Sequence, residues 1–235
     1  MNTSKTLICG KGILNKIHLV EKEDRIFGNI NIRISANNIV SFKANEKKIT
    51  RNGKINPSYK ALRTMSKEYK DTTMVQNIED ADVITIQNNF EYPNANFYNM
   101  INYDMNKDKI YHNNFKKIKL ATRKETKLKQ RIIFKSYGVY VEKIEGKYIY
   151  TRLIDYKGLA QKQTFYNYND VDIKEGEILD IVGTIFEGLI QGVPCCNYNI
   201  VKARKSSVIT MEDVKNSIIN YEKYIQDIRT QESPF

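Results

Sequence analysis

Cysteine and histidine are scarce in this chain of 235 residues, which contains three cysteines and two histidines. Cys195 and Cys196 are adjacent, and no pair of cysteines has the CxxC spacing of a zinc site. We therefore expect neither a bound metal nor a disulfide framework. We expect one of the adjacent cysteines to face a core as a small hydrophobic side chain, with a cysteine–histidine catalytic pair as the alternative.

Long apolar runs are also missing, and we expect no export signal. The most apolar stretch, residues 177–193, is interrupted by Asp180 and Glu187, so it falls short of the roughly eighteen uncharged residues that a membrane span needs. The first residues, MNTSKTLICGKG, lack the apolar segment of a signal peptide. We expect a folded, cytoplasmic protein without a membrane partner.

The common catalytic motifs are absent as well. The sequence contains no GxxxxGK[ST], GxGxxG, GxSxG or HExxH. Asp80 and Asp82 precede a predicted strand and could bind a nuclease metal, but no third acidic residue follows at a recognisable spacing, and a solvated turn is the alternative. We expect no catalytic residues, no metal and no cofactor.

Positive charge is abundant and unevenly distributed. The net charge is +11. The segment from position 116 to position 135 contains nine basic residues and a single acidic residue, Glu125. Residues 43–70 are also strongly basic, whereas residues 170–180 are acidic. A polarised basic surface indicates a polyanionic partner, although a charged surface that promotes solubility would look the same.

Alternation of apolar and polar residues predicts a mainly β protein with accessory helices. Strands are expected near residues 6–20, 25–34 and 37–44, a helix over 56–70, and strands over 81–87 and 110–120. In the second half, strands are expected near residues 132–144, 146–156, 160–168, 175–186 and 193–203. A final helix begins at Met211, with Thr210 as its cap.

Two successive units of five strands match two five-stranded OB-like Greek-key barrels plus a C-terminal helix. Other small Greek-key barrels would give the same order of elements. We place the first barrel, with an inserted helix and a long aromatic loop, at residues 1–121 and a polar linker at 122–130. The second barrel is placed at 131–205, and the C-terminal helix and tail at 206–235.

The aromatic residues favour one use of this fold. In the strand near residue 150, Tyr148, Tyr150 and Arg152 share one side, whereas Ile149 and Leu153 share the other. OB proteins stack the bases of single strands on exposed rings and follow the phosphates with basic side chains. A tyrosine ladder that only stabilises the sheet is the alternative. The candidate DNA contacts are Phe27, Arg33, Phe42, Lys43, Tyr92, Tyr98, Lys135, Tyr137, Tyr148, Tyr150, Arg152, Tyr156, Lys162, Phe165 and Tyr166.

The progression from RIFGNINIRI through SYKALRTMSKEYK to ADVITIQNNFEY, followed by a second strand-rich unit, resembles a tandem-OB single-stranded DNA-binding protein of phages and mobile elements. The resemblance implies a non-catalytic protein that coats DNA in replication or recombination. It also implies a place in a bacterial cell or phage-infected host, and a protein that can form a homo-oligomer. Pro234 and Phe235 resemble the terminal tip with which bacterial proteins of this class bind replication and repair partners. An RNA- or duplex-binding regulator and a protein-interaction module are the alternatives.

Overall fold

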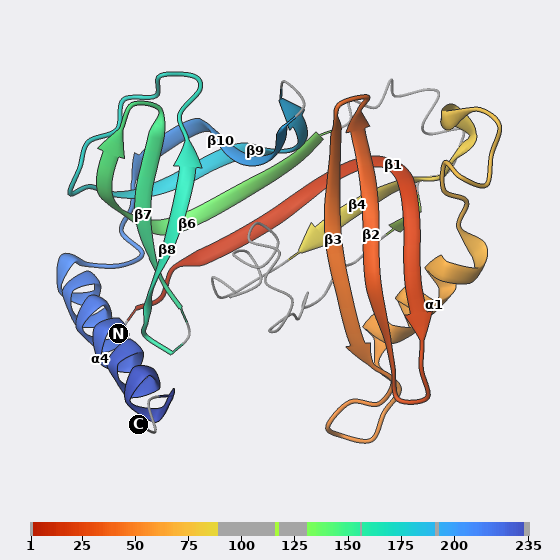
Figure 1. Cartoon of the computed structure of the whole chain (residues 1–235), viewed down its shortest axis with the longest axis horizontal. Helices are drawn as coiled ribbons and strands as arrows, with labels where there is room; N and C mark the ends of the chain where they lie inside the picture. The colour runs from red at the N-terminus through yellow and green to blue at the C-terminus, as the bar shows by residue number, and fades with distance from the viewer. Residues whose placement is uncertain (1, 89–115, 118–130, 156, 191–192, 233–235) are drawn as a thin grey trace.

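The computed structural model describes residues 2–88, 116–117, 131–155, 157–190 and 193–232, and within these it is mainly β (Figure 1). The predicted class, mainly β with accessory helices, is confirmed. Ten strands join in one sheet. The strands are β1 (Lys5–Glu21), β2 (Arg25–Ser35), β3 (Asn38–Lys47), β4 (Val83–Asn88), β5 (Lys116–Lys117), β6 (Arg131–Glu145), β7 (Tyr148–Ile154), β8 (Ala160–Tyr166), β9 (Ile178–Ile190) and β10 (Val193–Lys205).

Strand β1 belongs to both halves of the molecule and crosses between them in Figure 1. Its first part, Lys5 to Lys11, pairs antiparallel with β6 from Tyr137 back to Arg131. Its later part pairs with β2, and the middle also pairs with β4. At Gly10 the strands approach so closely that a Cβ atom would lie 2.2 Å from the Arg131 carbonyl oxygen. The sheet is therefore continuous from one half to the other.

A bulge interrupts β1 between Leu14 and Lys16. Leu14 is buried before the bulge, and Ile17 packs against the same core after it, so Asn15 is the extra residue. The Ile17 backbone N–H donates to Asp71 Oδ2 at 2.8 Å, and the Asp71 side chain is buried. The segment that follows the first helix thus holds the bulge in place.

The second half has a distinct pairing order. Strands β6, β7 and β8 are antiparallel neighbours, and β9 pairs antiparallel with β10. β10 meets β8 through one parallel pair, Asn199 with Tyr166, and β9 pairs again with β6 from Ile133 to Tyr140. Following the strand pairings from β6 to β7, β8, β10 and β9 therefore leads back to β6.

Two α-helices accompany the sheet in the described part of the chain. Helix α1 (Pro57–Glu68) is capped by the Asn56 side chain and buries Tyr59, Leu62 and Met65, as its three- and four-residue spacing predicts. Helix α4 (Met211–Glu232) contacts β7 and β8. Among the described residues, no helix has the length and apolar character to span a membrane.

One large core cluster draws apolar side chains from both halves of the sheet. At its centre in the second half, Phe134 stacks on Phe165 with ring centres 5.3 Å apart, and Tyr198 meets Phe134 edge-on at 5.5 Å. Gly183 allows this packing, because a Cβ atom there would lie 2.5 Å from the Phe134 ring. The three rings fix the positions of β6, β8 and β10 relative to each other.

Candidate nucleic-acid interface

The outer side of β7 and β8 carries the aromatic surface that the sequence predicts. Ile149 and Leu153 are buried, whereas Tyr148 is 49% exposed, which confirms the predicted alternation. Tyr148 lies opposite Tyr166 on β8, with ring centres 5.3 Å apart and planes tilted by 58°. We define the tyrosine face as Tyr148, Tyr150, Lys162 and Tyr166; Lys162 is exposed on the same side of β8.

Tyr150 is half-buried and interacts with an ion pair from the end of β6. Its hydrogen bond with Glu145, together with partial burial and the carboxylate charge, raises the pKa of Tyr150. Lys143 forms an ion pair with Glu145. The hydrogen bonds from Lys143 and then Tyr150 lower the pKa of Glu145, so this carboxylate is charged at neutral pH. The tyrosine face therefore has an acidic residue at its edge.

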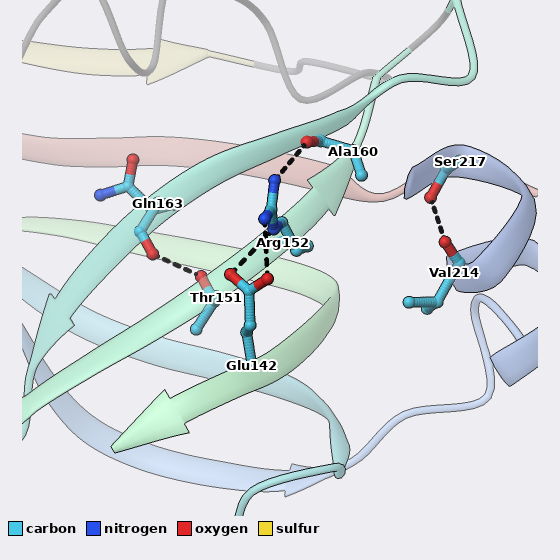
Figure 2. Close-up of polar contacts among 7 residues, drawn as sticks. All are labelled: Glu142, Thr151, Arg152, Ala160, Gln163, Val214 and Ser217. Atoms are coloured by element: carbon cyan, nitrogen blue, oxygen red, sulfur yellow. Dashed lines mark hydrogen bonds and ion pairs between the residues drawn. The ribbon is translucent and has the colours of Figure 1, made fainter. Parts of the chain in front are cut away.

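Arg152 points to the predicted side of β7 but is engaged within the protein. Figure 2 shows its guanidinium against the Glu142 carboxylate, to which Nε and Nη2 donate at 2.9 and 2.7 Å, and beside the Ala160 carbonyl oxygen at 3.4 Å. The side chain is only 11% exposed. Because the bidentate pair satisfies the guanidinium, Arg152 is not available to a phosphate in this conformation.

Helix α4 closes one end of the tyrosine face. The Tyr221 ring lies 5.8 Å from the Arg152 guanidinium carbon, and Asn220 Nδ2 donates to the Gly158 carbonyl oxygen at 3.5 Å. Val214 packs with Ile154 and holds the start of the helix against the sheet. The open part of the face is therefore the end that carries Tyr148 and Tyr166.

A second candidate surface lies on the outer side of β2. Phe27 and Arg33 are half-buried there, and Arg33 Nε donates to Asn15 Oδ1 at 3.0 Å. Lys22 Nζ lies 5.3 Å from the centre of the Phe27 ring. Sequence reasoning selected the aromatic ring but missed this lysine. The signal was present, because the EKED turn between two predicted strands places Lys22 beside Phe27.

Two predicted contact residues lie in the core, which corrects the prediction. Phe42 is 2% exposed and Phe165 is 1% exposed, so neither ring can stack on a base. Phe42 alternates with the half-buried Ser41 on β3, and Phe165 packs on Phe134. These two phenylalanine rings are thus buried, whereas Tyr148 and Tyr166, which carry a hydroxyl group, lie on the outer side of the sheet.

The remaining candidates are dispersed or undescribed. Lys135 and Tyr137 are half-buried on the part of β6 that pairs with β1, away from β7. The Lys43 side chain lies outside the described part of the structure. The same is true of the residues Tyr92, Tyr98, Tyr156, Pro234 and Phe235.

The two aspartates considered for a metal form local contacts. Asp82 Oδ2 accepts the Lys70 backbone N–H at 2.8 Å, and Asp80 Oδ2 accepts Asn77 Nδ2 at 3.2 Å. In the described ranges, no group of three or more histidine, cysteine or acidic side chains could hold a metal ion.

Comparison with known families adds one finding. Residues 10–189 match the model of the family described as YorF. The chain belongs to the YorF family. The match includes the tyrosine face and the outer side of β2, and it ends before α4. Comparison with curated proteins gave no match.

Proposed function

We propose that this YorF-family protein binds single-stranded DNA with little sequence preference and protects or presents it during replication or recombination. The observation that carries the proposal is the cross-strand pair of Tyr148, which is exposed, and Tyr166, which is half-buried, at the open end of the tyrosine face. Base stacking on such rings contributes about 1–3 kcal/mol per base and tolerates any base. The net charge of +11 supports a polyanionic ligand.

The strand pairing supports an OB-type barrel in the second half. The order β6-β7-β8-β10-β9, with β9 again beside β6 and a parallel contact between β8 and β10, is what a closed five-stranded barrel of this kind requires. The first half has the order β3-β2-β1-β4-β5, with α1 between β3 and β4, which supports a related and more open unit. OB proteins bind nucleic acid over their second and third strands, which correspond here to β7 and β8.

Fluorescence anisotropy with labelled oligo-dT tests the proposal. We expect tight binding that weakens as salt is added, and a loss of roughly 5- to 150-fold in affinity when Tyr148 or Tyr166 is changed to alanine, which is the equivalent of about 1–3 kcal/mol. Tyr224→Ala is the matched control, because Tyr224 is an exposed tyrosine on α4. Equal losses in all three variants would argue against the tyrosine face.

Two further probes separate the proposal from its alternatives. A matched RNA and a DNA duplex are titrated under the same conditions as oligo-dT. Preferred binding of RNA or of the duplex would favour a regulator that reads base edges or helix shape. Absence of binding to all three would leave the tyrosine face as a protein interface.

A further inference from the structure

The outer side of the first three strands has an unusual distribution of charge. In β2, the odd-numbered residues from Arg25 to Arg33 point away from the buried isoleucines at positions 26, 30 and 32. Their partners across the ladders are even-numbered residues of β1 after its bulge and odd-numbered residues of β3. We define the β1–β3 face as the described residues on this outward side of β1 after its bulge, of β2 and of β3, together with Lys22, which follows β1.

None of these described outward residues is acidic, because the carboxylates of the same strands lie on the other side. Glu21 accepts the Tyr59 hydroxyl of α1 at 2.5 Å and pairs with Arg63 at 3.0 Å. Glu46 accepts Asn56 Nδ2 at 3.0 Å. The pleat of the sheet thus directs negative charge toward α1 and positive charge toward solvent.

Two carboxylates, Glu23 and Asp24, lie at the edge of the face in the turn between β1 and β2. Asp24 pairs with Arg25 at 3.1 Å. The hydrogen bond from Arg25, and then the charges of Arg25 and Lys47, lower the pKa of Asp24, so this carboxylate is charged at neutral pH and offsets part of the positive charge at this edge. Lys16, Lys22 and Lys47 are exposed and remain as the described lysines of the face.

Aromatic and polar groups lie between these cations. The Lys22 ammonium is 5.3 Å from the Phe27 ring centre, which places a cation beside an aromatic surface. Asn29 is exposed, and Ser41 Oγ donates to Asn31 Oδ1 at 3.0 Å on the neighbouring strands. Lysines, amides and hydroxyl groups are the side chains that bind phosphate and sugar oxygens along a nucleic-acid backbone.

The tyrosine face differs in this respect. Glu142 and Glu145 border it, and they pair with Arg152 and Lys143, so these two neighbouring cations are already engaged by carboxylates. A single strand bound to both surfaces would therefore stack its bases mainly on Tyr148 and Tyr166. Its phosphates would release their counterions mainly at the other surface.

On this basis we infer that the β1–β3 face is a second contact surface for single-stranded nucleic acid, and that it binds the sugar-phosphate backbone. The inference rests on the proposed function. It assigns the salt dependence of DNA binding to the N-terminal half. The argument that selects this partner is charge complementarity between a polyphosphate chain and a cationic face whose strands carry no outward acidic residue.

The test compares two triple variants of equal charge change. Each replaces three exposed lysines with glutamine, which removes three positive charges without altering the core. The face variant carries Lys16→Gln, Lys22→Gln and Lys47→Gln, and the control variant carries Lys60→Gln, Lys215→Gln and Lys223→Gln.

Affinity for oligo-dT is measured as a function of salt concentration. For single strands, each lost phosphate contact reduces the magnitude of the negative slope of log K against log salt by about 0.7. We therefore expect this slope to be shallower by up to about 2 in the face variant. The control variant keeps the slope of the unsubstituted protein. Equal slopes in the two variants would overturn the inference but leave the proposed function intact, provided that the unsubstituted protein binds oligo-dT.

An abasic strand of deoxyribose phosphates separates the two surfaces directly, because it has no bases to stack. We expect the face variant to bind it more weakly than the control variant does, whereas Tyr148→Ala binds it as the unsubstituted protein does. If Tyr148→Ala weakens binding of the abasic strand and the face variant does not, the assignment is wrong. Failure of the unsubstituted protein to bind oligo-dT at all would overturn the proposed function and this inference together.

Discussion

Asn2 and Asp213 are 211 residues apart in the chain and are joined by two hydrogen bonds. The Asn2 backbone N–H donates to Asp213 Oδ1 at 3.2 Å, and Asn2 Nδ2 donates to Oδ2 at 3.1 Å. The same carboxylate accepts the Thr210 backbone N–H at 3.0 Å, while Thr210 Oγ1 accepts the Asp213 N–H at 3.2 Å. One side chain thus completes the cap of α4 and holds the segment that leads into β1.

Asp213→Ala is expected to lower the free energy of unfolding by about 1–2 kcal/mol, because it removes a helix cap and the contacts with Asn2. Urea denaturation measures the loss. Asp227→Ala, an exposed position on the same helix, should change stability by less than about 0.5 kcal/mol. Similar values for the two variants would mean that the contacts of Asp213 are energetically unimportant.

Phe165→Ala should destabilise the protein by about 3–5 kcal/mol, because it opens a cavity between Phe134 and Tyr198. Tyr148→Ala, on the surface, should cost little stability. Urea midpoints of the two variants distinguish a core ring from a surface ring. A small effect of Phe165→Ala would contradict its placement in the core.

Gly10→Ala tests the close contact between the two halves. The added Cβ atom would lie 2.2 Å from the Arg131 carbonyl oxygen and 2.7 Å from the Ile132 Cα, so β1 and β6 must separate. We expect a loss of about 1–3 kcal/mol, the usual cost of overpacking. Amide hydrogen exchange should increase on both strands. Faster exchange confined to β1 would show that β6 does not depend on this pairing.

Glu21 predicts a pH dependence of stability. The hydrogen bond from Tyr59, followed by the charges of Arg63 and Lys67, lowers its pKa below the ordinary value of about 4.5 despite some desolvation. A lowered pKa in the folded state stabilises the protein above pH 4.5, and this contribution disappears as the pH falls through the folded-state pKa. Glu21→Gln should therefore flatten the stability profile below about pH 4.5 in urea titrations. Glu222→Gln, at an exposed position of α4, is the control and should leave the profile unchanged.

Glu142→Gln is expected to strengthen DNA binding. The substitution removes a negative charge beside the tyrosine face and releases the Arg152 guanidinium from its bidentate pair. We expect a several-fold gain in oligo-dT affinity at low salt, with a steeper salt dependence. An affinity that falls instead would show that the ion pair positions β6 and β7 for binding.

Local alternation of side chains was enough to predict several elements. In β7, aliphatic residues occupy one side and tyrosines the other, and the strand was predicted correctly together with its buried face. Thr210, three residues before Asp213, likewise predicted the start of α4. These features depend on residues that are close in the sequence, so the sequence contains them explicitly.

Features that depend on strand register could not be predicted in this way. In AQKQTFY, polar residues occupy both parities, so nothing local indicates that Gln163 and Phe165 are the buried pair. Arg152 was correctly placed on the outer side, but its partner Glu142 belongs to a strand whose pairing with β7 is irregular between Val141 and Lys143. The pairing of β1 with β6 has no local signal, because its partners are at least 120 positions apart.

The bulge at Asn15 has a consequence for how this strand tolerates insertions and deletions. Deleting Asn15 would leave Leu14 and Ile17 two positions apart, so both would still face the core in a regular strand. The extra residue is therefore not needed for the apolar pattern. What it supplies is a backbone carbonyl for the Thr72 hydroxyl at 2.7 Å and a side-chain oxygen for Arg33. A shortened chain would keep its interior and lose the support beneath Arg33, so the added residue serves the outer surface of the sheet.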